Sequence, residues 1–276
     1  MPEHQGSYDL DLDGAFLKDL PRSIKRYTFQ GKEQFYNILE TETAHFKTST
    51  NTSEFLLFHA NKKTIETLFD PLNEDTDLAK FCSSFDTSEQ LFLVAMRSAP
   101  HNKAAAEMNC LIRKALTSMG LEYAIQEYPG ITVQGKTRGK IPNYGWGPKR
   151  RGCGPSVPLE IAFSEPDSKL NSDVRFWLNP DDGKADICLT LRIDKSRPEI
   201  RIEKWERQND RPHRSQVISM IRSQDKAKVT VTGHPLIIPF DALFRRQPVD
   251  SREKNLESSE RELEALAESI WEEQDW

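Results

Sequence analysis

One glutamate lies at the centre of an apolar run. In the segment Val157–Phe163 every second residue is large and apolar, and Glu160 shares the opposite set of positions with Ala162. This alternation predicts a β-strand with one buried face. A carboxylate in such a strand costs stability unless it is paired or ligates something. Two interpretations stay open: a carboxylate paired with an Arg or Lys from a neighbouring strand, or a ligand of a hard cation of the magnesium type.

The segment that leads into this strand is basic. It contains no Asp or Glu from Tyr128 to Leu159, and glycines are interleaved with its cations. Positive charges on a flexible connection suit the phosphates of a polyanion, and aromatic side chains can stack on bases. The nucleic-acid-binding candidates are therefore Lys136, Arg138, Lys140, Trp146, Lys149, Arg150 and Arg151. The alternatives are a solvated basic loop or a docking site for the protein's own acidic tail.

Helices are predicted on both sides of this region. Ser98 and Pro100 open a helix that runs to Met119, and Gly120 follows it at the position favoured for a left-handed cap. A second helix from Ser164 to Leu178 follows the Glu160 strand, with an apolar face of Leu170, Val174, Trp177 and Leu178.

Strands are predicted for most of the remaining central segments, which are 90–97, 121–128, 130–134, 186–192, 199–206, 228–232 and 236–240. The order from 100 to 192 is thus helix, strands, strand, helix, strand. The sequence predicts an α/β (α+β) core built on a mixed sheet flanked by helices.

The two ends of the chain have different patterns. Apolar residues at helical spacing in 35–46 and 54–69 predict a helical N-terminal region over residues 1–86. The core is assigned to 87–250, and an acidic amphipathic tail helix to 251–276, where Ser259 and Glu262 form a candidate capping box. Either end could contact a protein partner or a second copy of the chain, or simply pack on the core.

Composition limits the class of protein. The chain has 276 residues and a formal net charge of −5, but residues 251–276 hold nine acids against three bases, so the remaining 250 residues are close to neutral. No apolar run is long enough to cross a membrane, and the polar start of the chain predicts no signal or transit peptide. The four cysteines are widely spaced, which argues against a zinc ribbon or a disulfide framework. We expect an intracellular protein, cytoplasmic or nuclear.

These residues together carry a family resemblance. Residues 88–245 resemble the PD-(D/E)XK phosphodiesterase superfamily. Five segments carry this resemblance: GKIPNYGWGP, PSVPLEIAFSE, KLNSDVRFWL, GKADICLTLRID and EIRIEKWE. Within this superfamily, the chain is most similar to a branch of uncharacterised fungal restriction-endonuclease-like proteins. The resemblance implies a restriction-endonuclease-like core and nuclease chemistry, with one or two magnesium ions, or manganese as a substitute, held by two acids.

The resemblance also assigns site residues. The acid of the PD motif falls on Asn143, the second acid on Glu160 and the motif lysine on Ala162, while Glu107 is the candidate helix acid. The resemblance therefore implies that Glu160, Asn143 and Glu107 are the metal ligands. Two of the three core positions depart from the pattern, since an amide carries no charge and Ala162 cannot orient a water.

Two helix residues have open roles. Lys169, four residues before Asp173 on the second predicted helix, is a substitute for the missing motif lysine, although the pair could equally form a surface salt bridge. His101 is a further helix position of interest, or a core histidine with one hydrogen bond.

The functional expectation has two forms. The chain is a metal-dependent nucleic-acid phosphodiesterase with Asn143, Glu160 and Lys169 at its catalytic site, or a catalytically degenerate relative that binds nucleic acid or protein. The departures at Asn143 and Ala162 favour the second form.

Overall fold

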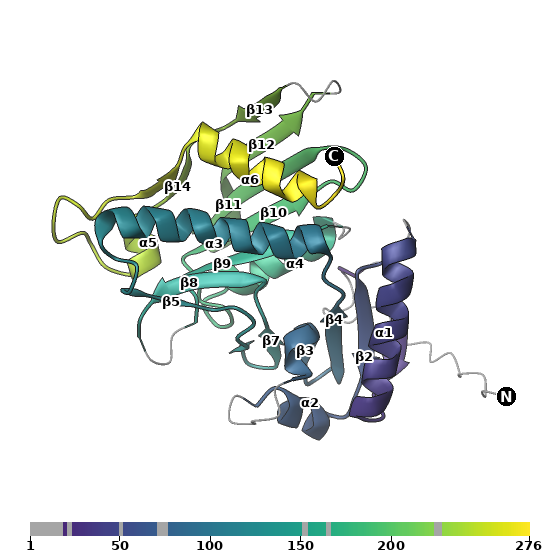
Figure 1. The fold of residues 1–276 in the computed structure, drawn as a ribbon. Helices are drawn as coiled ribbons and strands as arrows, with labels where there is room; N and C mark the ends of the chain where they lie inside the picture. Colours follow the sequence, from purple (N-terminus) through teal and green to yellow (C-terminus); the bar gives the residue numbers. More distant parts are fainter. Residues whose placement is uncertain are drawn as a thin grey trace.

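The computed structural model describes residues 19–20, 24–49, 52–70, 77–150, 154–163, 167–223 and 228–276. Two large sheets organise this part of the chain (Figure 1). Sheet A has the order β1-β2-β4-β3-β7-β6, sheet B the order β13-β12-β11-β10-β9-β8-β5, and β14 pairs with β15.

Sheet A contains strands from two separate parts of the chain. Its members are β1 (Lys25–Thr28), β2 (Phe55–His59), β3 (Cys82–Asp86), β4 (Leu91–Ala95), β6 (Val133–Gln134) and β7 (Arg138–Lys140). Helices α1 (Lys32–Thr48) and α2 (Lys62–Leu68) accompany it, and a short 3-10 turn covers Ala79–Phe81. Phe35 of α1 and Ile65 of α2 pack in one core with Phe58 and Phe92 of the sheet.

The N-terminal region is not entirely helical as predicted, because it also contains strands. Residues 55–59, assigned to a helix from the apolar spacing, form β2. Its residues alternate between two cores: Leu56 and Phe58 face α1, whereas Phe55 and Leu57 pack with Leu91 and Leu93 on the other side. A strand buried on both faces is apolar at every position, and such a run has no periodicity that separates it from a helix.

Sheet B carries most of the strands predicted for the core, but those predicted at 90–97 and 130–134 lie in sheet A, and the strands at 144–148 and 211–222 were not predicted. Its strands are β5 (Ile125–Glu127), β8 (Tyr144–Pro148), β9 (Val157–Ala162), β10 (Ile187–Ile193), β11 (Glu199–Gln208), β12 (Arg211–Arg222) and β13 (Val229–Thr232). Within the described strands of sheet B, β9 and β10 pair in parallel and the other neighbours are antiparallel; helix α4 (Asp167–Leu178) lies between β9 and β10 in the chain. With α3 (Ala99–Met119) in front, the order helix, strands, strand, helix, strand is confirmed, and the core is a mixed sheet flanked by helices.

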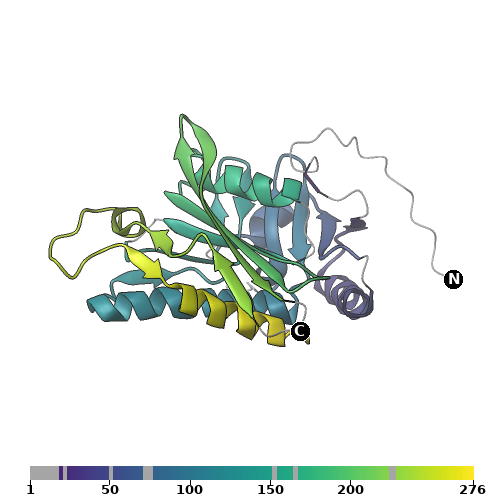
Figure 2. The ribbon, with the colours of Figure 1, turned by 90° about the horizontal axis from the view of Figure 1, so that it is seen from above.

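Helices cover both faces of sheet B (Figure 2). Helix α3 and the C-terminal helix α6 (Glu260–Glu272) lie side by side on one face, and α4 lies on the other. Helix α3 begins with a Ser98 cap and ends at Gly120 in the left-handed conformation, as predicted. The small pair β14 (Leu236–Ile238) and β15 (Leu256–Ser258), with α5 (Phe240–Phe244), closes one end of this core.

The acidic tail helix is part of the main core. Leu263, Ala267, Ile270 and Trp271 of α6 are buried in the cluster that includes α3 and sheet B, and the capping box of Ser259 and Glu262 is present. The tail is therefore packed on its own domain, and the hypothesis that it occupies the basic segment is wrong. Its apolar face has a large area to bury, and α3 supplies the complementary face.

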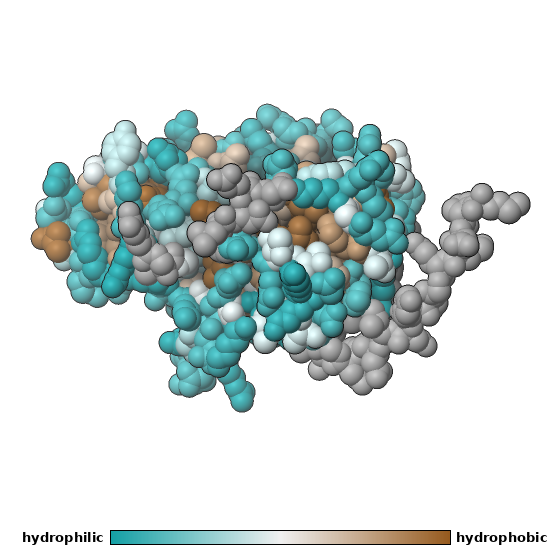
Figure 3. All heavy atoms as spheres, turned by 90° about the horizontal axis from the view of Figure 1, so that it is seen from below, coloured by the Kyte–Doolittle hydropathy of each residue, from teal (hydrophilic) through white to brown (hydrophobic). Residues whose placement is uncertain are grey.

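Surface features are modest. In the described part of the chain no helix has the length and apolar character of a membrane span. Figure 3 shows a mainly hydrophilic face whose hydrophobic atoms form small separate patches. Cys82, Cys110 and Cys188 are free thiols, and Cys153 lies outside the described residues.

Candidate functional site

Glu160 lies in the buried part of β9. Every residue of this strand is buried, and Glu160 is only 4% exposed. Its side chain is on the face covered by α4, where the indole Nε1 of Trp177 donates a 2.6 Å hydrogen bond to Oε1. The same oxygen lies 3.4 Å from the ammonium nitrogen of Lys140. The carboxylate therefore has a hydrogen-bond donor and a counter-ion within the protein.

Lys140 comes from the other sheet. It ends β7, a short strand that pairs with β3 and places residue 140 at the border of the two sheets. The preceding Gly139 is required there because a Cβ would lie 2.2 Å from ring atoms of Phe85. The Lys140 side chain is 2% exposed, and its Nζ lies 2.8 Å from Oδ2 of Asp173.

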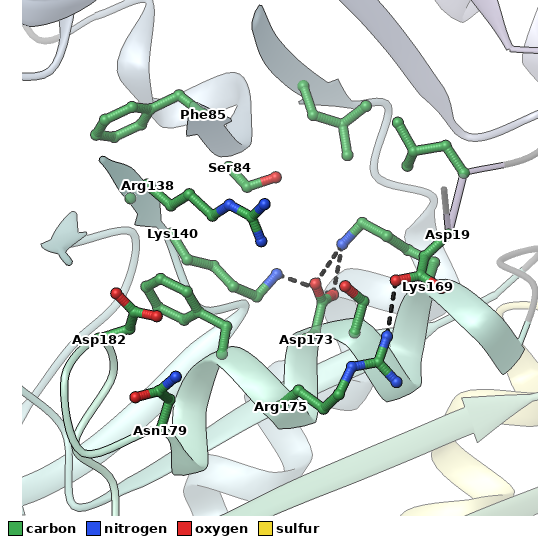
Figure 4. A pocket seen from close by; sticks show the side chains of 15 residues that line it. Asp19, Ser84, Phe85, Arg138, Lys140, Lys169, Asp173, Arg175, Asn179 and Asp182 are labelled. Carbon is green, nitrogen blue, oxygen red and sulfur yellow. Dashed lines mark hydrogen bonds and ion pairs between the residues drawn. The ribbon is translucent and has the colours of Figure 1, made fainter. Parts of the chain in front are cut away.

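Helix α4 completes the group. Lys169 Nζ donates to both oxygens of Asp173, at 2.5 and 2.6 Å. Figure 4 shows Lys140 and Lys169 reaching the Asp173 carboxylate from two directions. Both members of this pair are less than 10% exposed, so the interpretation as an ordinary surface salt bridge is wrong. We call Lys140, Glu160, Lys169 and Asp173 the buried charge cluster.

The two acids of this cluster differ in electrostatics. Burial raises the pKa of Asp173, but the Lys140 and Lys169 ammonium groups outweigh it, so the net pKa is below its ordinary value. For Glu160, burial is the larger effect and raises the pKa, with Lys140 only partly opposing it. The physical difference is contact: Asp173 receives hydrogen bonds from both lysines, whereas Lys140 is farther from Glu160.

Asn143 and His101 lie next to β9. The Asn143 Oδ1 atom accepts a 2.6 Å hydrogen bond from the backbone N–H of Ile161, so this amide fixes the strand. His101 is 3% exposed, and its imidazole lies near the side chains of Asn102 and Asn143. Burial and the positive charge of Arg97 lower the pKa of His101 to about 3, and the imidazole is neutral at physiological pH.

The metal set implied by the family resemblance is not assembled. Glu107 accepts a 3.0 Å hydrogen bond from Ser269 and lies 3.1 Å from Lys103, at the contact of α3 with α6. Across the residues that the structure describes, no group of three or more His, Cys, Asp or Glu side chains is arranged to hold a metal. Magnesium needs several oxygen ligands, whereas the oxygens of Asn143, Glu160 and Asp173 already accept hydrogen bonds within the protein. The residues present do not fit a magnesium or manganese ion.

Several cations of the basic segment are paired with acids from elsewhere in the chain. Arg138 pairs with Asp86 of β3 at 2.9 Å, and Lys136 with Asp181, which follows α4, at 3.2 Å. Lys149 and Arg150 are exposed, and Arg151 lies outside the described residues. The segment is acid-free in sequence but not in space, because β7 and the residues around it contact β3 and the end of α4.

Trp146 has a structural position. It is fully buried in the sheet B core, and its Nε1 donates to Asn109 of α3 at 2.9 Å. This position leaves the ring no face on which a base could stack.

A cavity of about 660 Å³ opens between sheet A and α4. Its basic lining consists of Arg138, Lys140, Lys169 and Arg175, and its acids are Asp19, Asp173 and Asp182. Glu160 does not line the cavity, because Lys140 and α4 stand in front of it. A ligand would therefore meet the partly exposed Arg138 and Arg175 first, and the two buried lysines on Asp173 lie deeper. Figure 4 shows these side chains around the cavity.

Sequence reasoning identified parts of this site. The open alternative that Glu160 is paired with a cation is what the structure shows, although Lys140 belongs to the other sheet. Asp173 as the centre of the cluster was missed. The available signal was the spacing of Lys169 and Asp173 on the helix that directly follows the Glu160 strand.

Comparisons with known proteins give little beyond this geometry. No protein-family description and no curated protein matches the chain. Among solved structures, the chain is similar to a protein of Anabaena variabilis that is assigned to DUF820 as a nuclease candidate. The two are 12% identical with a TM-score of 0.37, over 67% of this chain and 90% of the other.

Proposed function

We propose that this chain is a catalytically degenerate protein of nuclease-like fold that binds nucleic acid without a metal ion. The observation that supports this function best is the position of Lys140. Its ammonium lies 2.8 Å from Asp173 and 3.4 Å from Glu160, and so supplies between two carboxylates the positive charge that a metal would bring. In this proposal the lysine replaces the metal structurally and leaves the protein able to bind, but not to cut.

The cavity supports phosphate binding. At the wall of the cavity, Lys140 and Lys169 both contact the carboxylate of Asp173. Glu160 does not line the cavity. Arg175 is half-exposed and pairs with Asp19, a residue on a different part of the chain. Ammonium and guanidinium groups form strong, charge-assisted hydrogen bonds with phosphate oxygens. A phosphodiester that enters the cavity would meet Arg138 and Arg175 first, each already paired with an acid, and the two buried lysines behind them.

At its motif positions, the chain lacks the lysine and the free carboxylates that this type of nuclease uses for hydrolysis. Ala162 occupies the motif lysine position, and the carboxylates of Glu160 and Asp173 are engaged with indole and ammonium donors. A nuclease of this type needs a metal to lower the pKa of the attacking water and to stabilise charge on the phosphate. We infer that the natural protein performs neither step.

The test compares binding with cleavage. Labelled single- and double-stranded DNA and RNA are titrated by fluorescence anisotropy in EDTA and in magnesium, and the same mixtures with magnesium or manganese are resolved on a gel. Binding that persists in EDTA, with no cleavage, supports the proposal. Cleavage that depends on the metal, or binding that disappears in EDTA, contradicts it.

Two variants sharpen the test. Arg175→Gln should weaken binding severalfold, whereas Lys47→Gln, on the exposed side of α1, is the matched control with the same change in charge. Asn143→Asp restores the acid of the PD motif but should still not cut, because this oxygen accepts from the Ile161 N–H. Cleavage by Asn143→Asp would show that the metal site needs one carboxylate only.

A further inference from the structure

Three arginines lie together on the face of sheet B that α4 covers. Arg192 of β10 is the direct cross-strand partner of Arg201 of β11, and Arg214 of β12 is the partner of Trp205. The three line one cavity of about 170 Å³, together with Asp167 and Asn171 of α4, Thr190 and Glu203. We call Arg192, Arg201 and Arg214 the arginine surface.

Like charges on directly opposed residues destabilise a sheet, so the pairing of Arg192 with Arg201 carries a cost. Two acids offset it. Glu203, with a side chain 10% exposed, accepts hydrogen bonds from both Arg201 and Arg214, and Arg192 pairs with the exposed Asp167. Among the residues that the structure describes, the cavity is lined by three arginines and two acids.

The guanidinium groups are held in place. Glu203 Oε1 accepts from Nε of Arg201 and from Nη1 of Arg214, each at 2.7 Å. Arg214 also lies over the Trp205 ring, 5.7 Å from its centroid, and the Trp205 indole donates to Thr190 at 3.2 Å. Side chains fixed in this way lose little further entropy when they bind a ligand. The cavity has room for roughly five water molecules, enough for a phosphate group.

The strands that carry this surface extend beyond the sheet. The last β11 residue that pairs with β10 is Glu206, but β11 and β12 pair with each other as far as Gln208 and Arg211. The resulting two-stranded ribbon projects from the molecule (Figure 2), with Arg207 and Arg211 exposed near its tip. A ribbon of this kind fits the major groove of DNA. Arg207 shares the face of Arg201 and continues the arginine surface, whereas Arg211, paired with Gln208, lies on the other face of the ribbon.

We propose that the arginine surface and the ribbon tip form a second phosphate-binding region, on which the backbone of a nucleic acid lies. Arginine is suited to this role because its planar guanidinium can bind two phosphate oxygens at once. The region lies across α4 from the buried charge cluster: Asp167 and Asn171 line the arginine cavity, whereas Lys169 and Asp173 line the larger one. This inference rests on the proposed function and assigns to it a separate set of residues.

The experiment measures affinity against salt concentration. In anisotropy titrations with labelled single- and double-stranded DNA, the double variant Arg201→Gln/Arg214→Gln should bind at least about tenfold more weakly, and the slope of log affinity against log salt should decrease by about 2. Lys47→Gln/Lys63→Gln removes two exposed charges on α1 and α2, outside the arginine surface, and should change neither quantity.

A second variant avoids the risk of unfolding. Arg201→Gln/Arg214→Gln leaves the Glu203 carboxylate without its partners, whereas Arg207→Gln/Arg211→Gln changes exposed residues at the ribbon tip only. The Arg207→Gln/Arg211→Gln variant should also weaken binding and reduce the slope of log affinity against log salt. If the wild-type protein binds DNA and both double variants bind equally well, the inference is wrong while the proposed function stands. If the wild-type protein binds neither DNA nor RNA, the proposed function fails and the inference with it.

Discussion

The ammonium of Lys140 lies 2.8 Å from the carboxylate of Asp173, and this contact joins the two sheets of the molecule. Lys140 ends β7 of sheet A, and Asp173 is on α4, which covers sheet B. Glu160 of β9 is the third member of the same contact. An ion pair that is buried at the border of two sheets couples their packing, and its loss should affect the whole fold.

Replacement of Lys140 by Met tests this coupling. Met keeps the length of the side chain but leaves two buried carboxylates with one fewer counter-ion, and we expect the free energy of unfolding to fall by about 3–5 kcal/mol. Urea denaturation followed by circular dichroism measures it. Lys136→Met, which breaks an exposed pair, should cost less than about 1 kcal/mol. Similar losses for the two variants would show that the cluster contributes little.

Replacement of Lys140 by Ala should create an affinity for divalent cations. The substitution removes the cation that lies near both Glu160 and Asp173 and leaves Lys169 as the counter-ion of Asp173, so the Glu160 carboxylate loses its cation and can attract a hard metal ion. Manganese should therefore raise the melting temperature of Lys140→Ala and leave that of the wild-type protein unchanged. An equal increase in the wild-type protein would indicate that the metal binds elsewhere, or that Lys140 does not exclude it.

His101 should make the protein sensitive to mild acid. Its pKa is lowered to about 3 in the folded state, whereas the unfolded chain takes up the proton near the ordinary value of 6.5. Stability contributed by the neutral imidazole is complete above pH 6.5 and is lost as the pH falls toward 3, by about 1.4 kcal/mol per pH unit. Denaturation at pH 7 and pH 5 should show a larger loss for the wild-type protein than for His101→Gln. Equal losses would mean that His101 is protonated in the folded state.

Glu262 should stabilise the C-terminal helix through its charge. Hydrogen bonds from Lys114 and from the backbone and side chain of Ser259 lower the pKa of Glu262 to about 2, from an ordinary value of 4.5. Its side chain is partly exposed, so we expect Glu262→Gln to cost only about 1 kcal/mol at pH 7. The cost should disappear as the pH falls from 4.5 toward 2. Glu257→Gln, an exposed acid of β15, serves as the control; a pH-independent cost for Glu262→Gln would exclude the charge as its cause.

The sequence by itself determined most elements of sheet B, but strands β8 and β12 were not predicted. The strand around Glu160, the Ser98 and Gly120 caps of α3 and the capping box of α6 follow from local signals and are found in the structure, although β9 is buried on both faces. They can be read from the sequence because hydrophobic period and cap chemistry act over a few residues. The sequence also indicated that Glu160 needed a partner, since an apolar strand does not tolerate an unpaired carboxylate.

Only the tertiary structure decided which residues meet. The partner of Glu160 comes from β7, a three-residue strand that is too short to have a pattern, and the acids that neutralise the basic segment come from β3 and the end of α4. Strand β2 was missed because it is buried on both faces. Ion pairs between distant segments depend on how the sheets are placed against each other, and no local period in the sequence encodes that placement.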